Sequence, residues 1–128
     1  MSEVGYYLVK LDVSTGLAGA PTLHLTLGVY APTGHVTGSG EVTQALPPPY
    51  GVTPIPQLSG QIHHTGWGKD QQLVHLTGTA YLPHPPTQPI EIPAHFAASL
   101  AVDAAWNGTG SFTVGNHTIT HAKVTKVG

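Results

Sequence analysis

The sequence predicts an all-β fold, a single-domain antiparallel β-sandwich or barrel of about eight strands. The chain contains 16 Gly and 12 Pro among 128 residues, together about twice their average share. These residues separate runs rich in Val, Leu, Thr, Tyr and Ile, as turns separate strands in β proteins. A length of 128 residues fits one hydrophobic core, so residues 1–128 are expected to form one domain.

Eight runs are predicted as strands, and most of them start about 12 to 20 residues after the previous one, which suits a sandwich or barrel. The runs are Val4 to Val13, Thr22 to Tyr30, His35 to Ala45, Gln57 to Thr65, Gln71 to Leu82, Ile90 to Val102, Gly110 to Val114 and His117 to Val127.

Two of these runs alternate cleanly. From 23 to 29 every odd residue is Leu or Val, and from 74 to 82 every even residue is Val, Leu, Gly or Ala. Alternation at period two is typical of a strand with one buried face. The residues between them are mostly His and Thr, so the polar faces are predicted to carry imidazoles and hydroxyls rather than charges.

The segment from Pro93 to Trp106 allows two interpretations. Its proline, its six alanines and the following Asn107-Gly108 fit a short helix. The alternation of Phe96, Ala98, Leu100 and Val102 favours a strand, which is the interpretation we adopt.

Three strands repeat the order apolar, polar, Gly, polar around Gly38, Gly60 and Gly78. All three glycines lie on the inward-facing parity. A row of strand glycines allows a sheet to coil sharply, so we interpret the row as a device that closes the fold rather than as a ligand groove.

The composition excludes several classes of protein. Four Lys and no Arg provide no basic surface for a phosphate backbone, so no nucleic acid is expected as a partner. The absence of Cys excludes disulfides and thiolate metal sites. No apolar stretch is long enough for a membrane span, and the start lacks the pattern of a secretion signal. We therefore expect a protein that is cytoplasmic, or exported without a cleaved signal peptide.

Several segments resemble a small bacterial family catalogued as domain of unknown function 1842. They are Gly19-Ala20-Pro21-Thr22-Leu23-His24-Leu25, Thr33-Gly34-His35-Val36-Thr37-Gly38, Val42-Thr43-Gln44-Ala45 before a double proline, and Trp106-Asn107-Gly108-Thr109-Gly110. The resemblance covers most of the chain. It implies a compact all-β domain of bacterial origin and assigns no reaction and no catalytic residue.

Nine His make metal binding the first chemical hypothesis, because neutral imidazole is the commonest transition-metal ligand. Matching the inward faces of neighbouring strands places His63 opposite or diagonal to His75, within about 5 to 8 Å between Cβ atoms. This pair is the candidate metal site, and two imidazoles alone would bind weakly. The same matching places His24 opposite Glu41 as a surface pair.

Catalysis and cofactor binding are not expected. The six carboxylates are scattered singly, and no Ser lies in a Gly-x-Ser-x-Gly turn. Sugar binding is an alternative, because an aromatic ring beside hydroxyl and amide groups suits a sugar. The candidate ligand-binding residues are Tyr50, Trp67, Tyr81 and Trp106.

The sequence thus predicts a non-catalytic interaction module, not an enzyme, that forms a homo-oligomer, because few charges and exposed strand edges favour self-association. Its partner is a second copy, with another protein or a glycan as further candidates. The alternatives are a lectin-like module that uses aromatic and Pro-rich loops, such as Pro47-Pro48-Pro49-Tyr50 and Pro83-His84-Pro85-Pro86, and a His-based metal binder.

Overall fold

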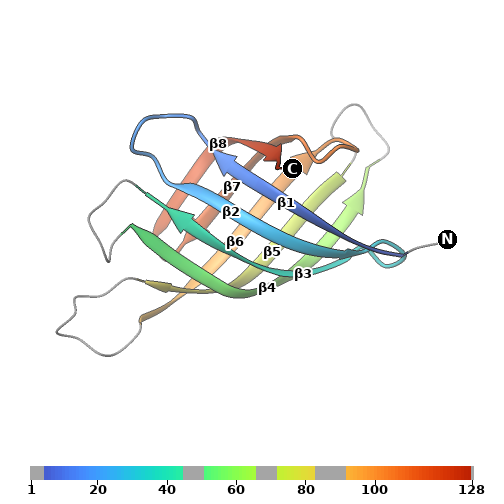
Figure 1. Ribbon diagram of the computed structural model, residues 1–128, viewed down its shortest axis with the longest axis horizontal. Helices are drawn as coiled ribbons and strands as arrows, with labels where there is room; N and C mark the ends of the chain where they lie inside the picture. The colour runs from blue at the N-terminus through green and yellow to red at the C-terminus, as the bar shows by residue number, and fades with distance from the viewer. Residues whose placement is uncertain (1–4, 45–50, 66–71, 83–91, 128) are drawn as a thin grey trace.

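The computed structural model describes residues 5–44, 51–65, 72–82 and 92–127, whose strands close into one antiparallel barrel (Figure 1). Each strand pairs with the next along the chain, and the last pairs with the first. The strands are β1 (Tyr6–Ser14), β2 (Thr22–Tyr30), β3 (His35–Thr43), β4 (Val52–His64), β5 (Gln72–Leu82), β6 (Ile92–Val102), β7 (Gly108–Val114) and β8 (His117–Lys126).

The predicted all-β class and the number of strands are confirmed, and the fold is a barrel rather than a sandwich. The segment after Pro93 forms β6, so the strand interpretation was correct. Among the described residues, no helix has the length and apolar character needed to cross a bilayer.

The largest error in the predicted boundaries is at β4, which begins at Val52 instead of Gln57. The extra segment contains Pro54 and Pro56, which suggest a loop when read from sequence. Its described partner is β3 alone, since the pairing of β4 with β5 begins only at Gln57. Proline is tolerated on such an unpaired side of a strand and at bulges, and Pro56 lies where the register shifts near Gly38 and Gly40.

The core fills the barrel with the residues that the alternation placed inward. In β2 the inward residues Leu23, Leu25, Leu27 and Val29 are all buried, and Phe96 from β6 is the largest fully buried side chain among the described residues. An eight-stranded barrel has an interior just wide enough for side chains to fill, which accounts for the continuous core.

The glycines at Gly38, Gly60 and Gly78 lie where neighbouring backbones approach closely. A Cβ atom at each position would overlap a backbone carbonyl oxygen of the adjacent strand, from Thr26, His75 or Gln57 respectively. No residue larger than glycine fits this spacing, which supports the interpretation that the row of glycines closes the barrel.

The barrel has two different ends. The end where β7 finishes and β8 starts, at the left of Figure 1, is called the Val114 end. It also includes the turn from Ser14 to Thr22, which connects β1 to β2. The Pro-rich segments Pro47-Pro48-Pro49-Tyr50 and Pro83-His84-Pro85-Pro86 lie outside the described residues. The other end, called the Trp106 end, contains the turn between β6 and β7.

Candidate functional site

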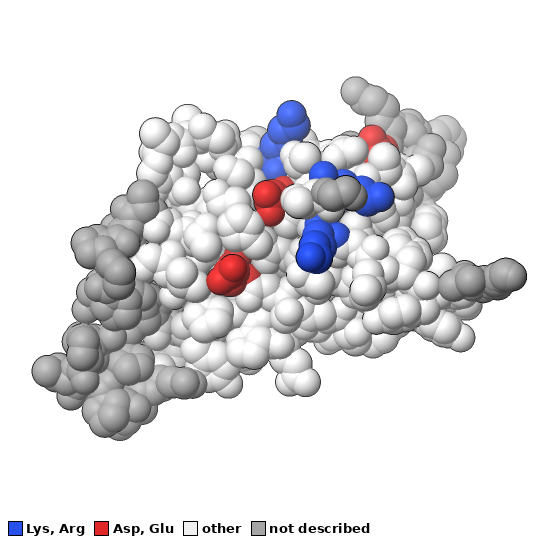
Figure 2. All heavy atoms as spheres, viewed as in Figure 1, with Lys and Arg blue, Asp and Glu red and all other residues white. Residues whose placement is uncertain are grey.

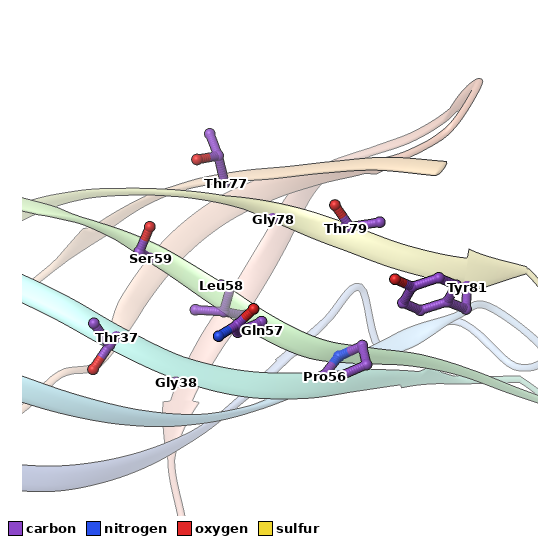
Figure 3. Close-up of a pocket in the computed structure, with 10 residues that line it drawn as sticks. All are labelled: Thr37, Gly38, Pro56, Gln57, Leu58, Ser59, Thr77, Gly78, Thr79 and Tyr81. Atoms are coloured by element: carbon purple, nitrogen blue, oxygen red, sulfur yellow. The ribbon is translucent and has the colours of Figure 1, made fainter. Parts of the chain in front are cut away.

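A groove of about 700 Å³ runs along the outer face of β3, β4 and β5 (Figure 3). Its polar side chains come from alternate, outward-facing positions of these strands. Thr37, Ser59 and Thr77 lie directly opposite one another across the three strands. The lining residues, which define the hydroxyl groove, are Thr37, Gly38, Pro56, Gln57, Leu58, Ser59, Thr77, Gly78, Thr79 and Tyr81.

The chemistry of the hydroxyl groove is polar and uncharged. Four hydroxyl side chains and the Gln57 amide donate and accept hydrogen bonds, and the Tyr81 ring offers an apolar face at the end of the groove (Figure 3). Of the four aromatic residues predicted to bind a ligand, Tyr81 therefore lies in a groove with suitable polar neighbours.

Trp106 occupies a different environment, because its side chain is only 4% exposed. The Asp103 carboxylate accepts hydrogen bonds from the backbone N–H groups of Ala105 and Asn107 and so fixes the turn. Trp106 has a left-handed backbone with a φ of 67°. Its ring meets that of Tyr7 edge to face at 6.4 Å between centroids, so it closes the Trp106 end rather than facing solvent. Tyr50 and Trp67 lie outside the described residues.

The predicted metal pair is on the outer face of β4 and β5. His63 lies opposite Leu73 and His75 lies opposite Gln61, so the two imidazoles are diagonal neighbours, as one of the two predicted arrangements required. Both imidazoles line a second groove, separate from the hydroxyl groove, with a volume of about 740 Å³, and His121 from β8 lines it as well. Within residues 5–44, 51–65, 72–82 and 92–127, however, no three His, Asp or Glu side chains are grouped closely enough to hold a metal ion.

A chain of side-chain hydrogen bonds crosses β1, β2 and β3. The His24 Nδ1 lies 2.8 Å from the Asp12 carboxylate, and its Nε2 lies 2.9 Å from the Thr43 hydroxyl. The predicted register of His24 opposite Glu41 is correct, but the imidazole contacts Asp12 and Thr43 instead.

This hydroxyl, imidazole and carboxylate order resembles that of hydrolases. It could not be predicted from sequence spacing, because the three residues belong to three different strands. A hydrolase also needs hydrogen-bond donors that stabilise an oxyanion. The pocket beside His24 is lined by the carboxylates of Asp12 and Glu41 and by the ammonium group of Lys10, whereas Thr43 does not line it. Because the hydroxyl that would act as the nucleophile lies outside the pocket, we interpret the chain of bonds as a link between strands.

The first half of β1 lacks a described partner on one side. Strand β8 pairs only with Leu11–Ser14 of β1, and the Val127 N–H then donates to the Lys10 carbonyl. On its other side β1 pairs with β2 over its full length. We call residues Tyr6–Val9 the open edge. Sequence reasoning missed it, although the four consecutive apolar residues there break the alternation found in other strands.

The outer side of the open edge is apolar. Leu8 is 68% exposed, and Tyr6 and Tyr30, which lie opposite each other in β1 and β2, are about half exposed. Gly28 lies opposite Leu8, and a Cβ there would overlap the Tyr6 hydroxyl, so the Tyr6 side chain lies over this glycine. The open edge therefore combines unpaired peptide groups with an exposed apolar surface.

Fixed charges occupy a small part of the surface. In the face shown in Figure 2, Lys, Asp and Glu side chains gather over a limited area, and most of the remaining surface is uncharged. Strands β4, β5, β6 and β7 contain no Lys, Arg, Asp or Glu. A partner that approaches these strands meets little charge repulsion.

Comparison with protein-family models matches residues 4–118 to the family described as "Domain of unknown function (DUF1842)". No curated protein sequence matches the chain significantly. The family match includes almost all of the barrel, from the start of β1 into β8. It agrees with the resemblance found in the four sequence segments, and the chain therefore belongs to the family of domain of unknown function 1842.

Proposed function

We propose that this protein is a non-catalytic interaction module that self-associates through the open edge of β1. The observation that carries the proposal is the unequal pairing of β1, which has β2 along its whole length but β8 only from Leu11 onward. An unpaired strand edge is a template for another strand.

The direction of the peptide groups supports a second strand at this edge. In an antiparallel strand, successive residues point their N–H and C=O groups to opposite sides. The Lys10 carbonyl accepts a hydrogen bond on the β8 side, whereas the Gly5 carbonyl accepts one from Ala31 on the β2 side. By this alternation, the peptide groups of Tyr6 and Leu8 face the open side.

A second copy of this chain fits the edge by two-fold symmetry. When Tyr7 lies opposite Tyr7 of the second copy, Tyr6 lies opposite Leu8 in both halves. Their peptide groups then form four hydrogen bonds without disturbing the bond between Val127 and Lys10. The exposed Tyr6 and Leu8 side chains of both copies also meet on one face, and no charge lies within Tyr6–Val9. This self-complementarity is what an isologous interface requires.

The oligomeric state of Leu8→Lys tests the proposal. A lysine at this edge introduces like charges beside each other in the dimer, so we expect its dissociation constant to rise at least about tenfold. Sedimentation velocity over a concentration series from about 1 to 200 µM measures the change, since a small interface is expected to dissociate in the micromolar range.

The matched control is Leu17→Lys, which changes an equally exposed leucine in the turn between β1 and β2. We expect this variant to associate like the unmodified protein. A protein that is monomeric at every concentration, or equal effects of the two lysines, contradicts the proposal.

Glycan binding in the hydroxyl groove is a second candidate function, favoured by the position of Tyr81 beside four hydroxyls and the Gln57 amide. Sugars stack their apolar faces on such rings and bind hydroxyl and amide groups with their own hydroxyls. We expect Tyr81→Ala to abolish hits on a glycan array, while Tyr30→Ala, which removes an exposed tyrosine outside the groove, retains them. An array without hits, or hits that persist in Tyr81→Ala, contradicts this candidate.

A further inference from the structure

The Val114 end of the barrel contains a cavity that is separate from the open edge and from the hydroxyl groove. Its volume is about 320 Å³, near the lower limit of about 300 Å³ for small-molecule sites. Five strands, β3, β4, β5, β7 and β8, contribute to its lining, together with one residue just before β2 and one just after β3. The described lining residues are Pro21, Val42, Gln44, Thr53, Leu82, Phe112, Val114, His117 and Ile119.

The cavity exists because the core stops short of this end. The inward residues in the middle of the barrel, such as Leu27 and Leu76, are completely buried. Val42 and Val114, the last inward residues of β3 and β7, each retain 9% exposure, and Leu82 and Ile119 are only partly buried. At the opposite end the buried Trp106 ring fills the equivalent space. Among the described residues, an aromatic ring therefore closes one end of the barrel, and a cavity remains at the other.

The lining combines an apolar wall with a few polar groups. Phe112, Val114 and Ile119 from β7 and β8 supply apolar surface. Gln44 and Thr53 lie at the rim on the β3 and β4 side, and the Gln44 Nε2 donates to the Gly19 carbonyl, which holds the amide in place. His117 lies at the rim at the start of β8. No Lys, Arg, Asp or Glu is among the described lining residues.

We propose that this cavity binds a small, uncharged and mainly apolar molecule that carries one hydrogen-bonding group. The apolar part packs against Phe112, Val114 and Ile119, where close contacts on all sides give favourable dispersion energy. The hydrogen-bonding group stays at the rim, beside Gln44, Thr53 or His117. Eight-stranded barrels are wide enough to hold one small ligand at a mouth, which matches this geometry.

Titration with the neutral fluorophore N-phenylnaphthylamine tests the proposal, because this probe is apolar and carries one N–H group. We expect saturable enhancement of its fluorescence with a stoichiometry of one per chain. Ile119→Trp fills the cavity with an indole, so we expect the affinity for the probe to fall at least about tenfold. Circular dichroism and thermal melting verify that the variant is folded.

The matched control is Thr118→Trp, the neighbouring residue of β8, whose hydroxyl bonds to Thr113 on the outer face. It adds the same indole outside the cavity and is expected to leave the affinity unchanged. If Ile119→Trp does not fold, Thr53→Tyr narrows the same cavity from its rim, with the same expected loss.

The probe could also bind the apolar surface beside the open edge, and Leu8→Lys separates the two sites. Loss of binding in Leu8→Lys but not in Ile119→Trp overturns the proposal, as does the absence of any saturable enhancement. Self-association is measured independently by sedimentation, so the proposal of a ligand in the cavity and the proposal of a dimer are tested separately.

Discussion

At Gly60 the carbonyl oxygen of His75 occupies the space that a Cβ atom would need. Gly60→Ala must therefore separate β4 from β5, and we expect the free energy of unfolding to fall by about 2 to 3 kcal/mol, as for other overpacked sites. Gly16, in the turn after β1, has a φ of 80° and no atom within 4 Å of its Cβ position. Gly16→Ala adds only backbone strain, which costs about 1 kcal/mol.

Urea denaturation of both variants measures this difference. Equal losses for Gly60→Ala and Gly16→Ala would show that close backbone approach is not what requires glycine at position 60. The presence of glycine at this position of the barrel would then need another physical explanation.

Among the residues that the structure describes, two other than glycine have left-handed backbones, His121 with a φ of 58° and Trp106 with a φ of 67°. His121 lies in β8 where the pairing with β7 shifts register beside Ser111, a position at which bulges favour glycine. We expect His121→Gly to raise the free energy of unfolding by up to about 1 kcal/mol, since it removes the strain of the histidine backbone.

The same substitution at Trp106 has the opposite expected effect. Trp106→Gly also removes strain, but it deletes a buried ring that packs against Tyr7. Loss of a buried aromatic side chain costs about 3 to 5 kcal/mol, so the variant is expected to be strongly destabilised. Thermal melts of the two variants should shift in opposite directions, and a parallel shift would contradict this account.

At the scale of the strand, the sequence predicted the core-facing side chains wherever one face of the strand is buried and the other is solvated. The alternation in β2, β5 and β6 predicted which side chains face the core, because a pleated strand repeats every two residues. The start of β4 could not be predicted in this way. Whether Pro54 ends a strand depends on whether a neighbour lies on its N–H side, and that is a property of the assembled sheet.

The candidate sites also differ in whether local sequence patterns predict them or only the assembled barrel shows them. The neighbourhood of His63 and His75 followed from matching inward faces, a local operation on two adjacent strands. The inward position of Trp106 depends on a left-handed turn residue, which a sequence pattern does not reveal. The open edge required the pairing of the first and last strands, and the point at which β8 stops pairing is visible only after closure.

At the scale of the whole molecule, the incomplete closure of the barrel and the distribution of charge both bear on self-association. A complete barrel has no strand edges, so a gap in its pairing such as the open edge is a natural place for a new strand to join. Fixed charges are absent from five of the eight strands, β2 and β4 to β7, and repulsion between copies is correspondingly weak. Both properties support the proposed self-association.

Amide hydrogen exchange along the open edge provides a direct test of the proposed dimer. In the monomer, Tyr7 and Val9 donate toward β2, whereas the N–H groups of Tyr6 and Leu8 face the open side. We expect slow exchange at Tyr7 and Val9 at all protein concentrations. Tyr6 and Leu8 should exchange rapidly in dilute protein and slow down as the concentration rises, because the second copy then accepts their hydrogen bonds.

This pattern distinguishes strand pairing from other modes of association. Contact through side chains alone would leave the exchange at Leu8 rapid at every concentration, and contact through the uncharged face of β4 to β7 would protect different amides. The Leu17→Lys variant should reproduce the concentration dependence, since its turn does not touch the edge. In Leu8→Lys the amide at residue 8 should remain rapidly exchanging, because like charges keep the two edges apart and the dimer that would protect it does not form.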